Sequence, residues 1–172
     1  GQALGGLMSL TGFPGDPPIR TFFPLIDRIT ALHATIGALA ALRERELSGE
    51  GQSIDVSLAD SGFTVNEIPI AAYLGNGAVQ EREGNGRGTM NAYETADGWA
   101  LLAANNDATW ERLCRALGRD DWLEDSRFTT RTGRLENAAE LEPGLSAWFS
   151  SRTTKEAVDH LTANGVPIAP VN

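Results

Sequence analysis

The sequence predicts an α/β protein in two parts, a partial doubly wound (Rossmann-like) large-domain segment followed by a small α+β domain. Three observations support this prediction. A long helical repeat near the N-terminus meets a glycine and continues directly into an alternating, strand-like segment. A stretch rich in glycine and asparagine then interrupts every periodic pattern. Beyond it lie two short strand patterns joined at Asp97-Gly98, with several helical patterns after them.

The first part of the chain contains two predicted helices and one predicted strand. Apolar residues recur every three or four positions from Leu25 to Ser48, with Pro24 suited to the first helical position and Gly49 to the C-terminal cap. Many residues of this helix are small, which permits close packing against a sheet or another helix. Residues 52–58 alternate and predict a strand, and a second helix is expected from about residue 59 to residue 74.

These patterns define three regions. Residues 1–74 are assigned to part of a large α/β domain. Residues 75–91 hold five glycines and three asparagines without periodicity, so they predict a glycine-rich linker or loop. Residues 92–172 form the predicted small α+β domain.

The small domain is expected to hold one hairpin, three further helices and a terminal strand. These elements are expected near residues 92–104, 108–117, 133–150, 153–164 and 165–172. Asn106 or Asp107 is suited to cap the first of these helices and Gly118 to end it, while Thr153 and Glu156 fit a capping box. Four tryptophans are expected to build the core of this domain: Trp99, Trp110, Trp122 and Trp148.

The composition excludes several classes of function. The net charge is −9, and an acidic excess spread along the chain repels phosphate backbones, which argues against nucleic-acid binding. The single cysteine, Cys114, allows no disulfide framework, is expected to be buried, and favours a cytoplasmic location. Two distant histidines without a second cysteine give no zinc pattern, so no metal is expected. No apolar run of membrane-spanning length is visible, so no membrane partner is expected.

The glycine-rich stretch from Arg82 to Gly88 is the strongest candidate binding element, because clustered backbone N–H groups can hold a phosphate, thioester or carboxylate. The alternative is a flexible linker, since its spacing matches neither a dinucleotide-binding fingerprint nor a P-loop. His33 is expected to pack on its helix and His160 to face solvent. Three serines lack a histidine or acid at a spacing typical of a nucleophile, namely Ser53, Ser57 and Ser61. The residues alone therefore assemble no complete catalytic set.

Six stretches, in order, carry the motifs of a known enzyme family. They are GQALGGLMSLTG (1–12), ALRERELSGEGQSIDVSLADS (41–61), REGNGRG (82–88), YETADGWALLAANNDATWERLCRALG (93–118), RTGRLENAAEL (131–141) and GVPIAPVN (165–172). Together they resemble the class III CoA-transferases, also called the CaiB/BaiF family, over nearly all of the chain.

The resemblance implies a fold and an activity. Members of that family are interlocked dimers, and each protomer has a large α/β domain built from both chain ends and a small domain from the middle. An aspartate accepts the acyl group as an anhydride and then carries CoA as a thioester. The matching position falls just upstream of Gly1, so we expect no catalytic residue in this chain and no activity from it alone. The resemblance thus predicts the central segment of a homodimeric enzyme that moves CoA between carboxylic acids.

The resemblance also implies residues that face the substrate. Gln2 belongs to the motif that follows the aspartate, and the glycine-rich loop of the family closes over the active site. The predicted substrate-binding residues are Gln2, Gly84, Asn85, Gly86, Gly88, Met90 and Tyr93. Coenzyme A and acyl-CoA enter as substrates, and no tightly bound cofactor is expected. Replacing Gly86 and Gly88 with alanine is expected to lower turnover with little loss of stability.

Two alternatives stay open. Racemases and epimerases of the same superfamily carry a glutamate after the second hairpin strand, where this chain has Asn105-Asn106-Asp107. Asn106 is the nearest match to that glutamate, which favours acyl-CoA transfer over exchange of an α-proton. The second alternative is a non-catalytic fragment or an interaction module.

Overall fold

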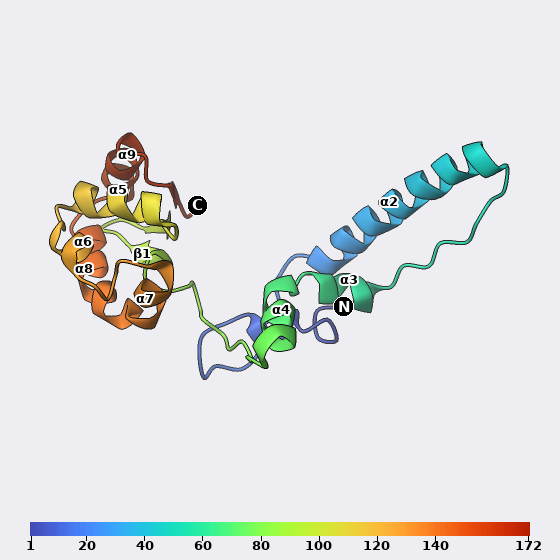
Figure 1. The fold of residues 1–172 in the computed structure, drawn as a ribbon, viewed down its shortest axis with the longest axis horizontal. Coiled ribbons are helices and arrows are strands. Elements are labelled where there is room, and N and C mark those ends of the chain that lie inside the picture. The colour runs from blue at the N-terminus through green and yellow to red at the C-terminus, as the bar shows by residue number, and fades with distance from the viewer. The chain divides into compact units, whose positions relative to one another are not determined.

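The computed structural model describes residues 1–172, which form two compact units, residues 1–84 and residues 85–172 (Figure 1). The helices of unit 1 are α1 (Leu7–Leu10), α2 (Leu25–Ser48), α3 (Leu58–Thr64) and α4 (Glu67–Asn76). The strands of unit 2 are β1 (Met90–Glu94), β2 (Trp99–Ala103) and β3 (Ile168–Pro170). Its helices are α5 (Asp107–Leu117), α6 (Asp121–Glu124), α7 (Arg131–Glu136), α8 (Ala138–Ser150) and α9 (Thr154–Ala163).

The longest element is α2, whose bounds match the predicted helix. Pro24 is its N-cap residue rather than its first helical residue, and Gly49 ends it in the left-handed conformation with a φ of 77°. The Gly49 N–H donates to the Arg45 carbonyl oxygen at 2.9 Å, which satisfies one of the last helical carbonyls. By length and composition alone α2 could cross a bilayer, contrary to the expectation from the sequence. This is weak evidence, because the core helix of a soluble protein or a signal sequence meets the same two criteria.

The predicted strand at residues 52–58 is wrong. Residues 50–57 form no regular element, and α3 begins at Leu58. A strand needs a neighbouring strand to exchange backbone hydrogen bonds, and every strand of the structure lies in unit 2. The segment packs on α2 instead, since a Cβ at Gly37 would lie 3.0 Å from Ile54 Cγ2.

The predicted helix 59–74 is interrupted, because α3 and α4 are separate helices. Asn66 is buried at the break between them, and its side-chain amide donates to the carbonyl oxygen of Gly5. Gly5 also lies directly against α3, since a Cβ at this position would be 2.5 Å from the carbonyl carbon of Gly62. The N-terminal segment is therefore held at the α3–α4 break.

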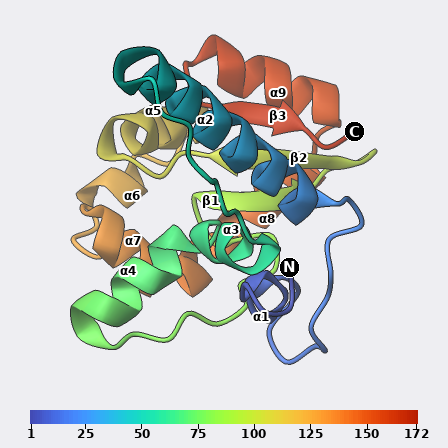
Figure 2. The same ribbon diagram turned by 90° about the vertical axis from the view of Figure 1, so that its right-hand side faces the viewer.

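The sheet of unit 2 is antiparallel with strand order β1-β2-β3. The predicted hairpin at Asp97-Gly98 is confirmed, with Tyr93 of β1 opposite Ala100 of β2. The last strand, β3, returns from the C-terminal end to pair with β2, where Leu101 lies opposite Ala169. Figure 2 shows α9 beside β3.

The first helix of unit 2 has the predicted ends. Asn106, rather than Asp107, caps α5, because its Oδ1 accepts a hydrogen bond from the Thr109 N–H at 2.9 Å. Gly118 ends α5 with a φ of 69°. A polar cap before the helix and a left-handed glycine after it account for both boundaries.

The later helices of unit 2 follow the prediction in part. Thr153 and Glu156 form the predicted capping box of α9. The predicted helix 133–150 is two helices, because Asn137 leaves the helical conformation with φ −106° and ψ 24° between α7 and α8. The short helix α6 was not predicted.

The hydrophobic core lies almost entirely in unit 2. Ile26 is the single buried hydrophobic residue of unit 1. In unit 2, Trp110 and Trp122 are buried and stack with ring centroids 5.8 Å apart, while Trp148 packs against the edge of the core. Trp99 departs from the prediction, because it is 43% exposed on the face of β2 that the core does not cover.

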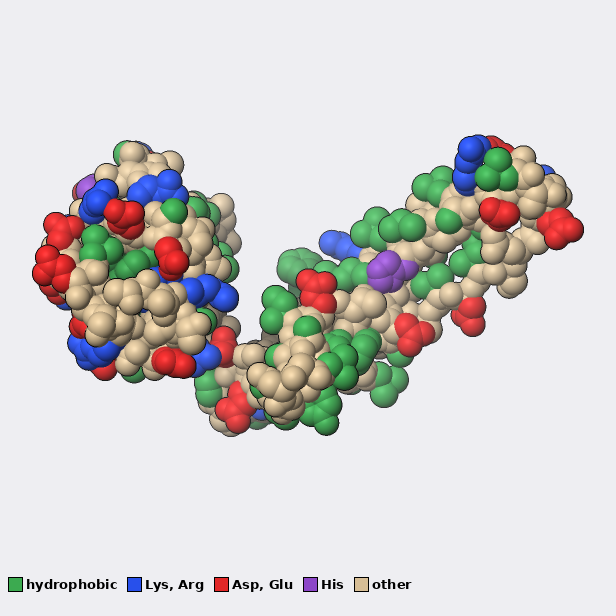
Figure 3. All heavy atoms as spheres, viewed as in Figure 1, with side chains coloured by type: hydrophobic (Ala, Val, Ile, Leu, Met, Phe, Trp, Pro, Cys, Tyr) green, Lys and Arg blue, Asp and Glu red, His purple; other side chains and the backbone are tan.

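Apolar side chains remain on the surface of α2 (Figure 3). Those exposed by between 52% and 68% are Leu32, Ile36, Leu39, Leu42 and Leu47. They recur at helical spacing, so they form one continuous apolar stripe, which we call the α2 stripe.

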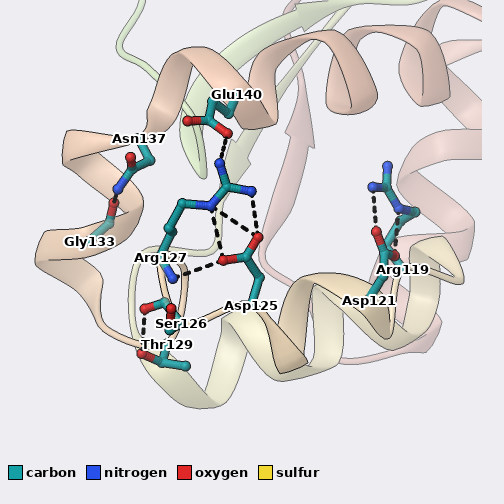
Figure 4. Close-up of polar contacts among 9 residues, drawn as sticks. All are labelled: Arg119, Asp121, Asp125, Ser126, Arg127, Thr129, Gly133, Asn137 and Glu140. Carbon is teal, nitrogen blue, oxygen red and sulfur yellow. Dashed lines mark hydrogen bonds and ion pairs between the residues drawn. The ribbon is translucent and has the colours of Figure 1, made fainter.

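Ion pairs join the surface segments around α6 and α8 (Figure 4). Arg127 lies between Asp125, at 2.6 Å, and Glu140 of α8. Arg119 pairs with Asp121 at 2.7 Å. These hydrogen-bonded arginines lower the pKa of Asp125 and of Asp121. Exposed pairs of this kind contribute little to stability.

Candidate functional site

Gln2 is anchored within unit 1. Its Oε1 accepts a hydrogen bond from the Thr21 N–H at 2.9 Å, and its Nε2 donates to the carbonyl oxygens of Thr21 and Phe23 at 3.3 and 3.4 Å. The amide of Gln2 therefore braces the segment that leads into α2.

Gly84 is the last residue of unit 1, and its position requires a glycine. Its φ is 63°, and an added Cβ would lie 2.5 Å from the ring of Phe13. The Gly84 N–H donates to the carbonyl oxygen of Gly12 at 3.0 Å. The predicted substrate-binding residue Gly84 is thus tied to the N-terminal segment.

The other predicted residues lie at the start of unit 2, between Asn85 and Tyr93. Residues 86–90 form a tight turn that we call the glycine-rich turn. Two backbone bonds close it, from the Arg87 N–H to Met90 O at 2.9 Å and from the Met90 N–H to Arg87 O at 3.2 Å. Gly86 has a φ of 107°, and an added Cβ would lie 2.1 Å from Met90 O. Asn85 and the Met90 side chain are exposed. The turn is therefore a defined structure rather than only a flexible linker.

Both backbone polar groups of Gly88 are occupied by side chains of unit 2. The Tyr93 hydroxyl donates to Gly88 O at 2.6 Å, and the Glu142 carboxylate accepts from the Gly88 N–H at 2.5 Å. This corrects the expectation of a free backbone donor at Gly88, because a buried N–H needs an internal partner. Asn91 also donates to Glu142 Oε1, at 3.3 Å.

Tyr93 connects the turn to the core of unit 2. It is 3% exposed and its ring stacks on Phe149 with centroids 4.8 Å apart. Burial, followed by the negative charge of Glu142, raises the pKa of Tyr93, so its hydroxyl stays protonated and acts as a donor. In this structure the hydroxyl is engaged within unit 2.

Glu142 was missed by reasoning from the sequence. It lies on α8, and nothing in the local pattern of that helix separates it from the neighbouring acidic residue Glu140. The relevant partner, Gly88, is 54 residues away. Only the packing of α8 along β1 brings the two together.

The structure brings together one pair that the sequence did not connect. His33 Nδ1 of α2 lies 3.0 Å from Ser61 Oγ of α3. Ser61 is 2% exposed, so its hydroxyl is shielded from a substrate and the contact links two helices. His160, although exposed as predicted, also makes a link, because its Nε2 lies 2.8 Å from the carbonyl oxygen of Ala116.

The surroundings of Cys114 and Asn106 indicate structural roles for both residues. Cys114 is fully buried as predicted, and burial raises the pKa of its thiol to about 12, which keeps it neutral and unreactive. Asn106, which the sequence comparison matched to the racemase glutamate, uses its side chain to cap α5. No group of three or more His, Cys, Asp or Glu residues is placed to hold a metal ion.

The glycine-rich turn lies at the start of unit 2, a small α+β unit, and unit 1 before it is helical. A model of the family described as CoA-transferase family III matches residues 1–172. The chain therefore belongs to CoA-transferase family III, as the resemblance predicted.

Curated relatives agree with this assignment. The chain is 36% identical over 171 residues to the succinyl-CoA–D-citramalate CoA-transferase of Chloroflexus aurantiacus, covering 97% of this chain and 42% of that protein. It is 32% identical over 174 residues to the succinate–glutarate CoA-transferase of Agrobacterium fabrum, covering 99% of this chain and 44% of that protein. The chain thus spans less than half the length of these relatives.

Solved structures show the same partial coverage. A CaiB/BaiF family protein from Brucella suis matches with a TM-score of 0.77 at 30% identity, over 99% of this chain and 46% of that one. The hypothetical protein Rv3272 from Mycobacterium tuberculosis matches with a TM-score of 0.84 at 27% identity, over 99% and 46%. The predicted fold class, a partial α/β segment followed by a small α+β domain, is confirmed.

Proposed function

We propose that the protein containing this chain transfers coenzyme A between carboxylic acids, with a short dicarboxylic acyl-CoA such as succinyl-CoA as donor. The observation that carries this proposal is the family match over residues 1–172. The names of relatives narrow the substrate class, since they include succinyl-CoA:mesaconate and succinate–glutarate CoA-transferases. Both names pair succinate with another small dicarboxylic acid.

The proposed reaction uses a carboxylate nucleophile. An aspartate upstream of Gly1 attacks the donor thioester, giving a mixed anhydride and free CoA thiolate. The thiolate then attacks the aspartyl carbonyl, which releases the donor acid and leaves an aspartyl-CoA thioester. The acceptor carboxylate repeats these two steps in reverse and leaves as a new acyl-CoA. Covalent catalysis of this kind keeps the thioester energy and divides one difficult transfer into easier steps.

In this proposal the chain supplies substrate contacts rather than the nucleophile. Asn85 and Met90, both exposed at the glycine-rich turn, would border the acyl group. We also propose that the chain alone is inactive, that the complete protein is a homodimer, and that it is cytoplasmic. The unpaired, buried Cys114 is in keeping with a reducing compartment.

The test is a CoA-exchange assay with the full-length protein. Succinyl-CoA is incubated with mesaconate, glutarate, citramalate, malate and, as monocarboxylate controls, acetate and propionate, and the acyl-CoA products are identified by mass spectrometry. We expect exchange with at least one dicarboxylate and none with the isolated chain. Absence of exchange with every acid would contradict the proposal. Deuterium uptake at the α-carbon without exchange would favour the racemase alternative, although Asn106 caps α5.

A further inference from the structure

Glu142 is the point where the glycine-rich turn meets the body of unit 2. Its Oε1 accepts from the Gly88 N–H and from the Asn91 side chain. Glu142 lies close enough to Tyr93 to raise the pKa of that hydroxyl, which itself donates to Gly88 O. The Glu142 carboxylate therefore contacts the turn directly, and it also lies next to Tyr93, the second side chain that holds the turn.

A further contact with unit 2 fixes the residue after Gly88. The next carbonyl oxygen, that of Thr89, accepts from the Ala104 N–H at 2.8 Å, so residues 88 and 89 are both fixed to unit 2. Gly86 lacks a Cβ and has a φ of 107°, and Asn85 before it is exposed. A glycine reaches many backbone conformations at little steric cost. The conformation of residues 85 and 86 therefore depends on the fixed residues 88 and 89.

We propose that Glu142 is a positioning residue for acyl-CoA transfer, whose carboxylate fixes the glycine-rich turn in the conformation that presents Asn85 and Met90 to the acyl group. This inference rests on the proposed function, in which the turn faces the substrate. Without the carboxylate, Gly88 loses the acceptor for its N–H, and the turn moves. Displacements of about 1 Å in positioning elements lower rates by as much as about 100-fold.

The experiment compares Glu142→Ala and Glu142→Gln in the full-length protein, with Glu140→Ala as the matched control. Glu140 lies on the same helix and carries the same charge, but it pairs with the exposed Arg127 and not with the turn. Kinetic constants kcat and KM are measured for the acceptor acid, and amide hydrogen exchange is followed in peptides covering residues 84–92. Glu142 borders an open cavity of about 330 Å³ together with Ser146, so its truncation creates no enclosed void.

We expect Glu142→Ala to speed exchange at Gly88 and to lower kcat/KM by about 10-fold to 100-fold. The melting temperature should also fall, because the buried Gly88 N–H loses its acceptor. Glu142→Gln should restore most of the activity, because its amide oxygen can still accept the Gly88 N–H. Glu140→Ala should match the wild type in both measurements.

Three outcomes would overturn the inference. Unchanged exchange at Gly88 in Glu142→Ala would show that the carboxylate does not hold the turn. Faster exchange with wild-type kcat and KM would show that the held turn has no part in transfer. A full-length wild type without CoA-transferase activity, whose exchange still responds to Glu142→Ala, would remove the proposed function and the positioning role with it, while confirming the contact.

Discussion

The hydroxyl of Tyr93 donates a hydrogen bond to the carbonyl oxygen of Gly88 at 2.6 Å, and the ring of the same residue stacks on Phe149 in the core. One side chain thus joins the glycine-rich turn to the centre of unit 2. Because both ends of Tyr93 are engaged, the conformation of the turn and the stability of the core are coupled.

Replacing Tyr93 with phenylalanine should destabilise unit 2 while preserving the ring stack. The change leaves the Gly88 carbonyl oxygen without its donor, and an unsatisfied buried acceptor costs about 1–3 kcal/mol. Urea unfolding followed by tryptophan fluorescence measures this loss, since all four tryptophans lie in unit 2. Tyr73→Phe is the control, because Tyr73 is 60% exposed on α4 of unit 1. Equal stability of Tyr93→Phe and wild type would mean that the bond contributes nothing.

Alanine at Gly86 should destabilise unit 2 more than alanine at Gly118. Both glycines have positive φ, 107° and 69°, which costs an L-residue roughly 1–2 kcal/mol. Only Gly86 adds a clash, since its Cβ would lie 2.1 Å from Met90 O, whereas Gly118 faces open space. This geometry argues against the sequence-based expectation that Gly86 and Gly88 can be replaced with little loss of stability. The same unfolding assay checks the order, and Gly86→Ala no less stable than Gly118→Ala would contradict the clash.

The contribution of Asp97 to stability should depend on pH. Its Oδ1 accepts from the Thr154 N–H at 2.7 Å and from the Thr154 hydroxyl at 2.8 Å, and these bonds lower its pKa from 3.8. A carboxylate whose folded pKa is lowered adds stability above the unfolded pKa and loses it as the pH falls through the folded pKa. Asp97→Asn should therefore lower the urea midpoint at pH 7.

The difference between Asp97→Asn and wild type should shrink as the pH falls below 3.8 towards the lowered folded pKa, because protonation then removes the charged acceptor from the wild type. Asp55→Asn serves as the control, because Asp55 is exposed in unit 1 and should not affect the tryptophan signal. A difference that stays constant from pH 7 to pH 3 would show that the carboxylate charge is irrelevant to the contact with Thr154.

Local signals in the sequence predicted most helix ends and the hairpin. The caps at Asn106, Gly49 and Thr153 act within four residues of the chain, so their chemistry is visible without the fold. The prediction of a strand at residues 52–58 was wrong because a strand depends on more than local sequence. Its alternating pattern indicates two faces, but a strand also requires a neighbouring strand. The prediction that Trp99 lies in the core was wrong for a similar reason, because the sequence of β2 does not show which of its faces is covered.

The candidate site was predictable only in outline. The glycines in and just before the turn are visible in the sequence, and positive φ values at Gly84, Gly86 and Gly88 explain why glycine stands there. The partners of the turn were not visible, because Glu142 reaches Gly88 across 54 residues through the packing of α8. The pairing of His33 with Ser61 depends in the same way on the contact of α2 with α3.

The isolated chain should self-associate through the α2 stripe. This stripe leaves Leu32, Ile36 and Leu39 more than 60% exposed, and Ile26 is the single buried hydrophobic residue of unit 1. A second apolar surface adds to it, a cavity of about 650 Å³ bordered by Leu10, Phe63 and other residues of unit 1. Apolar area of this extent drives association in water. Light scattering on the isolated chain should therefore show dimers or larger species, and Leu32→Lys with Leu39→Lys should reduce them.

Amide hydrogen exchange on the same sample separates association from general instability. Exchange should be slower in residues 85–172 than in residues 1–84, because nearly all buried apolar side chains lie in the former. Leu101→Lys is the matched control for the lysine variants, since Leu101 is 38% exposed but lies on β2 rather than on the α2 stripe. It should leave the association unchanged. A monomeric wild-type chain with equally slow exchange in both units would show that unit 1 is stable without a partner for its apolar surface.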